Sequence, residues 1–179
     1  MKISSLFSIA LAAITLIIFS GCSTDSGFTI QEPTFDSVPQ PYETTGTDEE
    51  TVVDGITKLT VEEGIGVDRV VIRDQVSMYI TLRAEDGTII YSSYQNNSTS
   101  PIQASIQNIT SPTRPVRSFS FERARTEGLR KGLIGMKEGE KRVIFVPPSQ
   151  GFESVFSGSI NEPYREDTLR YDVELDFIF

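Results

Sequence analysis

The chain has 179 residues, a formal net charge of −9, one cysteine and no histidine. These counts exclude Ser-His-Asp and Cys-His nucleophiles, imidazole metal ligands, an intrachain disulfide and a thiolate zinc cluster. The acidic balance argues against a nucleic-acid binder, because binding to phosphates needs clustered Lys and Arg, and the length allows one modest domain with extensions.

The first 22 residues have the layout of an export signal. Lys2 precedes an uncharged stretch that ends at Phe19, and its apolar run is shorter than the ~18 residues of a spanning helix. Small residues then precede Cys22, and the segment resembles the lipobox of bacterial lipoproteins, although Phe19 replaces the usual aliphatic residue. The resemblance implies a signal peptide over 1–21 and a lipid on Cys22 that anchors the chain to a membrane. An ordinary signal peptide or a membrane anchor, followed by a free cysteine, is the alternative.

The residue after Cys22 indicates a location. Ser23, in place of Asp, is compatible with sorting to the outer membrane in bacteria that read this position. We therefore expect a lipid-anchored protein of the bacterial cell envelope, on the outer membrane and facing the periplasm.

Residues 22–54 are predicted to be a flexible tether. Eight acidic residues and no base lie between residues 23 and 57, in a stretch rich in Ser, Thr and Pro without periodicity. Such a segment cannot bury enough apolar area to offset its chain entropy, so we expect an extended linker. A partner-binding acidic tail is the alternative. Residues 58–179 are close to neutral, with 15 bases and 17 acids.

The next elements are predicted to be strands. Residues 55–63 form a first strand, and residues 75–83 alternate apolar and polar side chains, as a half-buried strand does. A turn at 85–87 and a return over 88–92 complete a hairpin. Residues 94–115 are dominated by Gln, Asn, Ser, Thr and Pro, which indicates a long loop insertion with a weak strand around 102–109.

The remaining elements alternate between strand and helix. A strand is predicted over 116–121 and a helix over 122–133, followed by a strand over 142–146 that stops at two prolines. Residues 168–179 alternate again and form the last strand. Five to six strands and one short helix make residues 55–179 an α+β domain, with a mostly antiparallel sheet and the helix on one face.

Three separated motifs carry a family likeness. Residues 128–142 (GLRKGLIGMKEGEKR), 143–148 (VIFVPP) and 167–175 (DTLRYDVEL) resemble FKBP-type peptidyl-prolyl isomerases, as do the strand after Asp74 and residues 85–93 (EDGTIIYSS). The resemblance implies a bent antiparallel sheet wrapped around one short helix. It also implies catalysis of cis–trans isomerisation at Xaa-Pro bonds, with proline-containing exported polypeptides as substrates. That reaction makes and breaks no bond, so no cofactor or metal is expected.

The family's substrate pocket maps onto this chain residue by residue. The pocket floor, usually Trp, falls on Leu129, and the wall residue with its neighbouring Asp falls on Ile90 and Tyr91. A pocket Tyr falls on Phe152 and a late aromatic wall on Tyr171. A tyrosine of the early strand falls on Tyr79 or Ile80, and the apolar pair before the helix falls on Arg125 and Thr126. The predicted substrate-binding residues are therefore Tyr79, Ile90, Tyr91, Leu129, Phe152 and Tyr171, each of which also fits an ordinary core position.

Two functions remain open from the sequence. The first is a membrane-anchored isomerase that assists the folding of exported proteins by desolvating and twisting Xaa-Pro bonds in an apolar cleft. The second is a binding or scaffold lipoprotein of an envelope assembly, with the same fold and degenerate catalysis. The second is motivated by the missing Asp, Trp and tyrosine hydroxyl and by the insertion over 94–115.

Overall fold

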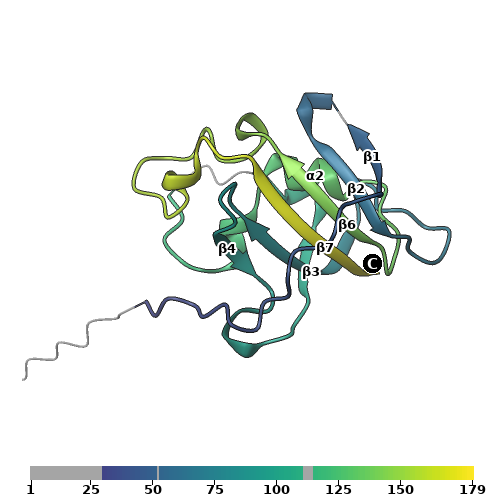
Figure 1. The fold of residues 1–179 in the computed structure, drawn as a ribbon, viewed down its shortest axis with the longest axis horizontal. Coiled ribbons are helices and arrows are strands. Elements are labelled where there is room, and N and C mark those ends of the chain that lie inside the picture. The colour runs from purple at the N-terminus through teal and green to yellow at the C-terminus, as the bar shows by residue number, and fades with distance from the viewer. Residues whose placement is uncertain (1–29, 52, 111–114) are drawn as a thin grey trace, which may run out of the picture. The chain divides into compact units, whose positions relative to one another are not determined.

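A seven-stranded sheet dominates the computed structural model, which describes residues 30–51, 53–110 and 115–179. The predicted signal peptide and Cys22 lie outside the described residues. The strands are β1 (Asp48–Thr51), β2 (Thr57–Glu62), β3 (Gln75–Arg83), β4 (Ile89–Ser92), β5 (Ile102–Ser105), β6 (Lys141–Val146) and β7 (Leu169–Ile178). Their order is β1-β2-β6-β7-β3-β4, and β5 also pairs with β3 (Figure 1). Every pairing is antiparallel.

The period-two pattern of the sequence sets which face of the sheet is buried. On β3 the side chains of Val76, Met78, Ile80 and Leu82 are all buried in the core, and on β7 those of Leu169, Tyr171, Val173 and Leu175. The α+β class and the antiparallel sheet are confirmed. The described part holds seven strands where five to six were predicted. One of them, β1, lies within the predicted tether and pairs with β2.

The helix is α2 (Glu127–Leu133), and it begins five residues later than predicted. Thr126 has an extended backbone and its Oγ1 accepts a hydrogen bond from the Leu129 amide at 3.0 Å, so it is the N-cap. The preceding residues form the 3₁₀ turn η4 (Phe121–Ala124) instead of the first helical turn. The strand predicted over 116–121 is absent from its described residues, where the Val116 carbonyl accepts a hydrogen bond from Ile160.

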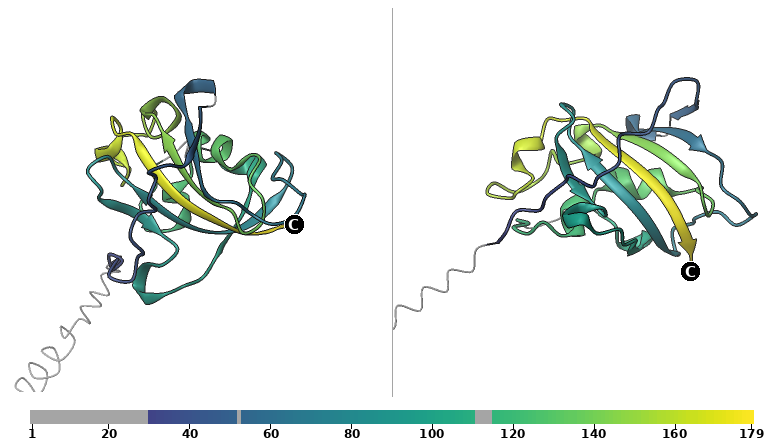
Figure 2. Two further views of the ribbon diagram at one scale, coloured as in Figure 1. Left: turned by 45° about the vertical axis from the view of Figure 1, so that its right-hand side comes forward. Right: turned by 60° about the horizontal axis from the view of Figure 1, so that its bottom comes forward.

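Two glycines let α2 approach the sheet closely. A Cβ atom on Gly128 would lie 2.2 Å from a Val146 methyl group, and one on Gly132 would lie 2.5 Å from an Ile144 methyl group. Because real side chains never come this close, only glycine fits where the helix crosses β6. The strands curve past this helix (Figure 2). Five further 3₁₀ turns connect the elements: η1 (Val53–Gly55), η2 (Gln95–Asn97), η3 (Ile106–Asn108), η5 (Pro148–Gln150) and η6 (Glu162–Tyr164).

The segment predicted as an insertion is partly ordered by the sheet. Within 94–115, β5 pairs with β3 and η2 and η3 flank it, whereas residues 111–114 lie outside the described part. The weak strand predicted around 102–109 is thus present, but shorter, at Ile102–Ser105.

Part of the predicted tether also lies on the folded unit. Residues 34–42, which we call the strap, hydrogen-bond to β3, β7 and the β4–β5 connection, and Glu32–Phe179 form one unit. The predicted flexible tether over 22–54 is therefore not free along its whole length, because residues 34–42 are bonded to the folded unit. The strap bonds mainly through its backbone, with the Ser37 hydroxyl as a further donor to the Tyr94 carbonyl, and its lack of periodicity did not reveal these contacts.

Candidate functional site

Five of the six predicted site residues belong to one buried apolar core. Leu129, Phe152 and Tyr171 have no exposed surface, Ile90 is 1% exposed and Tyr91 is 5% exposed. They come from α2, the segment after β6, β7 and β4, so the fold gathers positions that are far apart in the chain. In this structure they form one buried cluster, and four of them, all except Tyr91, are at most 1% exposed.

Tyr79, the sixth residue, lies on the other face of the sheet. It stacks on Tyr94 with 5.6 Å between ring centroids, and it is not in the core cluster. Ile80 takes the inward position instead, because β3 alternates without interruption from Val76 to Leu82. The register shift against β7 skips Asp176 on β7 and leaves the alternation of β3 intact. The alternation along residues 75–83 already placed Ile80 on the apolar face and Tyr79 on the polar face.

The cluster contains one buried polar chain that sequence reasoning missed. The Tyr171 hydroxyl lies 2.9 Å from Thr126 Oγ1 and 2.9 Å from the Ala124 carbonyl oxygen. The carbonyl can only accept, so Tyr171 donates to Ala124, and Thr126 must donate to Tyr171 while it accepts from the Leu129 amide. Burial raises the pKa of Tyr171 well above its ordinary value, so the hydroxyl is a neutral donor.

The turn η4 covers this cluster. Phe121 packs on Tyr91 with 5.8 Å between ring centroids, and Ala124 is fully buried. Arg123 holds the other side of the turn, because its Nε donates to Asn161 Oδ1 at 3.1 Å and its carbonyl accepts from Asn161 Nδ2 at 2.7 Å. The turn therefore packs on the cluster at Tyr91 and Tyr171.

An open cavity lies next to the covered cluster. It has a volume of about 330 Å³ and is bordered by Tyr91, Ser92, Ser93, Pro101 and Ile102. Gln95 also lines it, and the buried Oε1 of Gln95 has no hydrogen-bond partner. Burial raises the pKa of Tyr91 to about 12. Tyr91 is thus the predicted residue that borders both the cluster and a space open to a ligand.

No metal centre is found among the described residues. They contain no group of three or more His, Cys, Asp and Glu side chains placed to hold an ion. The chemistry available at the cluster is apolar desolvation with a small number of hydroxyl and amide groups.

Comparisons with known proteins agree with the geometry. Residues 66–176 match the family model of FKBP-type peptidyl-prolyl cis-trans isomerases, whereas no curated protein matches the chain significantly. Three solved structures illustrate the fold, each at an identity that establishes the fold alone.

The first is FkpA from Escherichia coli, with 21% identity and a TM-score of 0.55, over 73% of this chain and 51% of that one. This chain thus spans about half of FkpA. The second is the N-terminal domain of FKBP42 from Arabidopsis thaliana, with 16% identity and a TM-score of 0.59. The match covers 80% of this chain and 98% of that one. The third is a peptidyl-prolyl cis-trans isomerase from Pseudomonas syringae pv. tomato, with 20% identity and a TM-score of 0.51. The match covers 76% of this chain and 84% of that one. Since the family model covers more than half of the chain, this protein belongs to the FKBP-type peptidyl-prolyl cis-trans isomerases.

Proposed function

We propose that this protein is a lipid-anchored isomerase of the bacterial cell envelope that accelerates cis–trans isomerisation of Xaa-Pro bonds in exported polypeptides. The observation that carries the proposal is the family match over 66–176, together with a core that gathers Ile90, Leu129, Phe152 and Tyr171 beside the N-terminus of α2.

The residues of the cluster suit this reaction. The planar amide has a rotation barrier of ~18–20 kcal/mol, which makes the uncatalysed reaction take tens to hundreds of seconds. An apolar environment lowers the barrier because the twisted amide loses its resonance and with it part of its need for water. No base, nucleophile or metal is required, so the absence of histidine is no obstacle.

Access to the cluster requires η4 to move. The Ala124 carbonyl occupies the hydrogen bond of the Tyr171 hydroxyl, and Phe121 covers Tyr91. When the turn moves away, Tyr171 becomes a donor to a substrate carbonyl between apolar walls. The open cavity beside Tyr91 gives a substrate a place to bind before that movement.

The anchoring part of the proposal rests on the N-terminal sequence. Cys22 carries the lipid, and 11 residues, 23–33, separate it from the strap. Fully extended, they span at most about 40 Å. Within the described residues, no helix has both the length and the apolar character to cross a membrane.

A protease-coupled assay tests the activity. A chain that starts at Ser23, which retains the whole Glu32–Phe179 unit, is added to a Xaa-Pro peptide whose trans form alone is cleaved. We expect the slow phase to accelerate in proportion to protein concentration. A rate equal to that of buffer at high protein concentration would reject the isomerase.

Fractionation of cells tests the anchor. The full chain should incorporate a labelled fatty acid and sediment with outer membranes, and the Cys22→Ser variant should do neither. Equal sedimentation of both chains, without label, would reject the lipid anchor and leave the isomerase proposal untouched.

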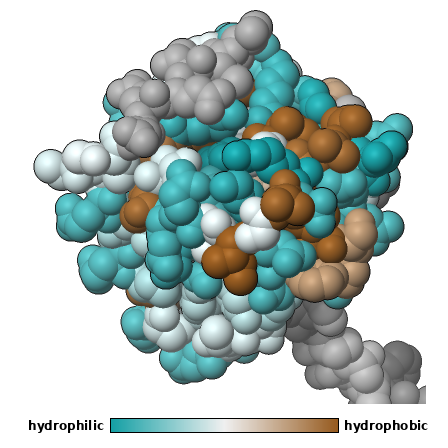
Figure 3. Space-filling view, turned by 90° about the vertical axis from the view of Figure 1, so that its right-hand side faces the viewer, coloured by the Kyte–Doolittle hydropathy of each residue, from teal (hydrophilic) through white to brown (hydrophobic). Residues whose placement is uncertain are grey.

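A second candidate is a binding protein of the same fold without useful isomerase activity. Two observations favour it: the predicted walls are closed, and the β2–β3 connection exposes four large apolar side chains, namely Ile65, Val67, Val71 and Ile72. Figure 3 views the molecule from the side of this connection and shows apolar areas among hydrophilic ones. A stable envelope partner that Val67→Asp releases, together with an inactive isomerase assay, would establish this candidate.

A further inference from the structure

A buried charge cluster lies on the outer face of the sheet, opposite α2. It consists of Arg83 on β3 and Arg170 and Asp172 on β7, and Arg83 forms an ion pair with Asp172. Arg170 donates to the Asp172 carboxylate from Nε at 3.1 Å and from Nη2 at 2.9 Å. Arg83 and Asp172 are only 5% and 6% exposed, although they point away from the core.

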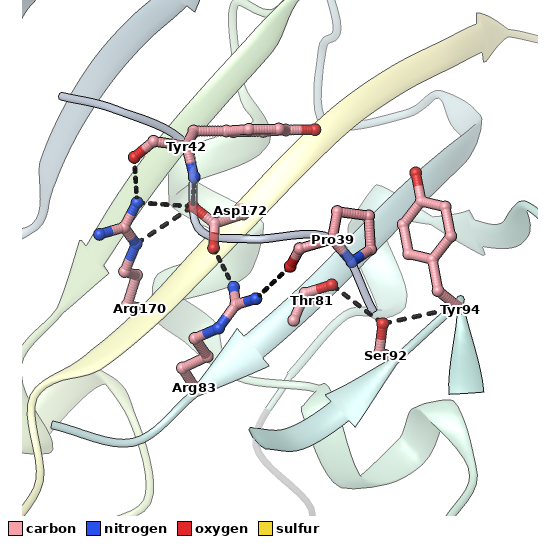
Figure 4. A network of polar contacts seen from close by, with 8 residues as sticks. All are labelled: Pro39, Tyr42, Thr81, Arg83, Ser92, Tyr94, Arg170 and Asp172. Atoms are coloured by element: carbon pink, nitrogen blue, oxygen red, sulfur yellow. Dashed lines mark hydrogen bonds and ion pairs between the residues drawn. The ribbon is translucent and has the colours of Figure 1, made fainter. Parts of the chain in front are cut away.

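The strap covers this cluster and is held by it (Figure 4). Arg83 Nη2 donates to the Pro39 carbonyl at 2.7 Å, and Arg170 Nη2 donates to the Tyr42 carbonyl at 2.6 Å. The Tyr42 amide donates to Asp172 Oδ1 at 3.4 Å. The strap is thus bound through its main chain by the same three charged groups that form the cluster.

These contacts match the chemistry of a proline-rich segment. Residues 39–42 read Pro-Gln-Pro-Tyr, and because proline has no N–H, they present four carbonyls but only two amide donors. Two guanidinium groups donate to two of the four carbonyls, those of Pro39 and Tyr42, and the carboxylate accepts from one of the two amides. Charge-assisted hydrogen bonds of this kind are stronger than neutral ones.

Aromatic rings and an unfilled space extend the site. Pro39 and Tyr42 border the same small recess as the stacked Tyr79 and Tyr94, and burial, then the charge of Glu174, raises the pKa of Tyr42. Beside Pro41, a cavity of about 440 Å³ opens between Phe145, Thr168 and the two arginines. The strap leaves this cavity unfilled, so a bulkier side chain has room there.

The strap has the character of a bound ligand. Pro39, Gln40 and Pro41 are all exposed, so the strap contributes no core side chain at these positions. Aromatic-lined grooves bind extended proline-rich segments in other proteins because such segments lose little entropy on binding.

We infer that this face, formed by Tyr79, Arg83, Tyr94, Arg170 and Asp172, is a binding groove for extended proline-containing polypeptides, and that the strap is its resident occupant. That external clients of this class use the groove rests on the proposed function, whereas the groove itself does not. A short linker holds the strap at an effective concentration in the mM range, so the intact chain excludes weak competitors.

Cleavage of the chain on the C-terminal side of the strap tests the inference. In the chain that starts at Ser23, a protease site is inserted between the two exposed residues of the turn at Thr44–Thr47, where the Thr47 amide bonds to the Thr44 carbonyl. After cleavage and removal of the released strap, a fluorescent peptide of residues 33–44 is titrated by anisotropy. We expect saturable binding to the cut chain and at least tenfold weaker binding to the uncut chain.

Matched variants locate the binding. Arg170→Met removes the donor to the Tyr42 carbonyl and leaves Asp172 paired with Arg83, so it should weaken peptide binding at least tenfold. Arg165→Met, an arginine that bonds to the Glu153 carbonyl elsewhere, should leave binding unchanged. An unrelated peptide that contains Pro-Gln-Pro-Tyr should compete, and the same peptide with both prolines changed to Ala should compete at least fivefold less well.

Three results would overturn the inference. They are absence of binding to a cut chain with native circular dichroism, equal binding to cut and uncut chains, and unfolding of the chain once the strap is removed. Isomerase activity measured on the same samples separates the two proposals, since inactivity with intact peptide binding rejects only the isomerase.

Discussion

At the scale of single residues, the Tyr171 hydroxyl distinguishes this core from a purely apolar one. It connects Thr126, the N-cap of α2, to the Ala124 carbonyl of η4. All three residues are fully buried, so no water replaces a lost partner. One hydroxyl therefore links the helix, the covering turn and the last strand.

Removing that hydroxyl should destabilise the fold. Tyr171→Phe leaves the Ala124 carbonyl and the Thr126 hydroxyl without their partner, and a buried unsatisfied group costs about 1–3 kcal/mol. Urea unfolding should show a loss in that range, whereas Tyr79→Phe, on the outer face, should change the free energy of unfolding by less than about 0.5 kcal/mol. Equal effects of both variants would contradict the buried chain.

Tyr91 should make stability depend on alkaline pH. Burial raises its pKa to about 12, so the unfolded chain loses this proton at a lower pH than the folded chain. The stabilisation is complete below the unfolded value of about 10 and is lost as the pH rises through about 12, at up to ~1.4 kcal/mol per pH unit. The free energy of unfolding, measured between pH 9 and 11.5, should fall less steeply for Tyr91→Phe. An unchanged slope would contradict the burial of this phenol.

At the scale of elements, η4 packs against the predicted walls, and under the proposed function it must move before a substrate reaches them. Phe121→Ala removes the ring that covers Tyr91 and should raise the isomerase rate several-fold, at a stability cost of about 1–3 kcal/mol. Phe156→Ala is the matched control, because Phe156 is 50% exposed and its removal should alter neither quantity. A folded Phe121→Ala chain with the wild-type rate would show that the turn does not limit access.

The elements also show how much of the fold could be predicted from the sequence. Alternation predicted β3 and β7 because one face of each is buried, and the family motifs predicted the gathering of Ile90, Leu129, Phe152 and Tyr171. The start of α2 was missed, because the cap at Thr126 competes with a continuous helical pattern from 122. The cover by η4 was missed too, since packing between distant segments leaves no local periodicity.

At the scale of the whole molecule, the two faces of the sheet have different roles. The inner face holds the apolar cluster and α2, and the outer face holds the charge cluster and the strap. The eight acidic residues without a base between 23 and 57 predicted a flexible linker, but strap residues 39–42 bond to the sheet through main-chain atoms, a contact that composition does not reveal.

The central claim is that this fold catalyses prolyl isomerisation despite its altered pocket. Exchange NMR on an alanine-proline-phenylalanine peptide, at equimolar concentration with the Ser23–Phe179 chain, measures cis–trans exchange directly and without a coupled protease. The account predicts exchange faster than in buffer, and faster still with Phe121→Ala. Exchange at the buffer rate with both folded chains would contradict it.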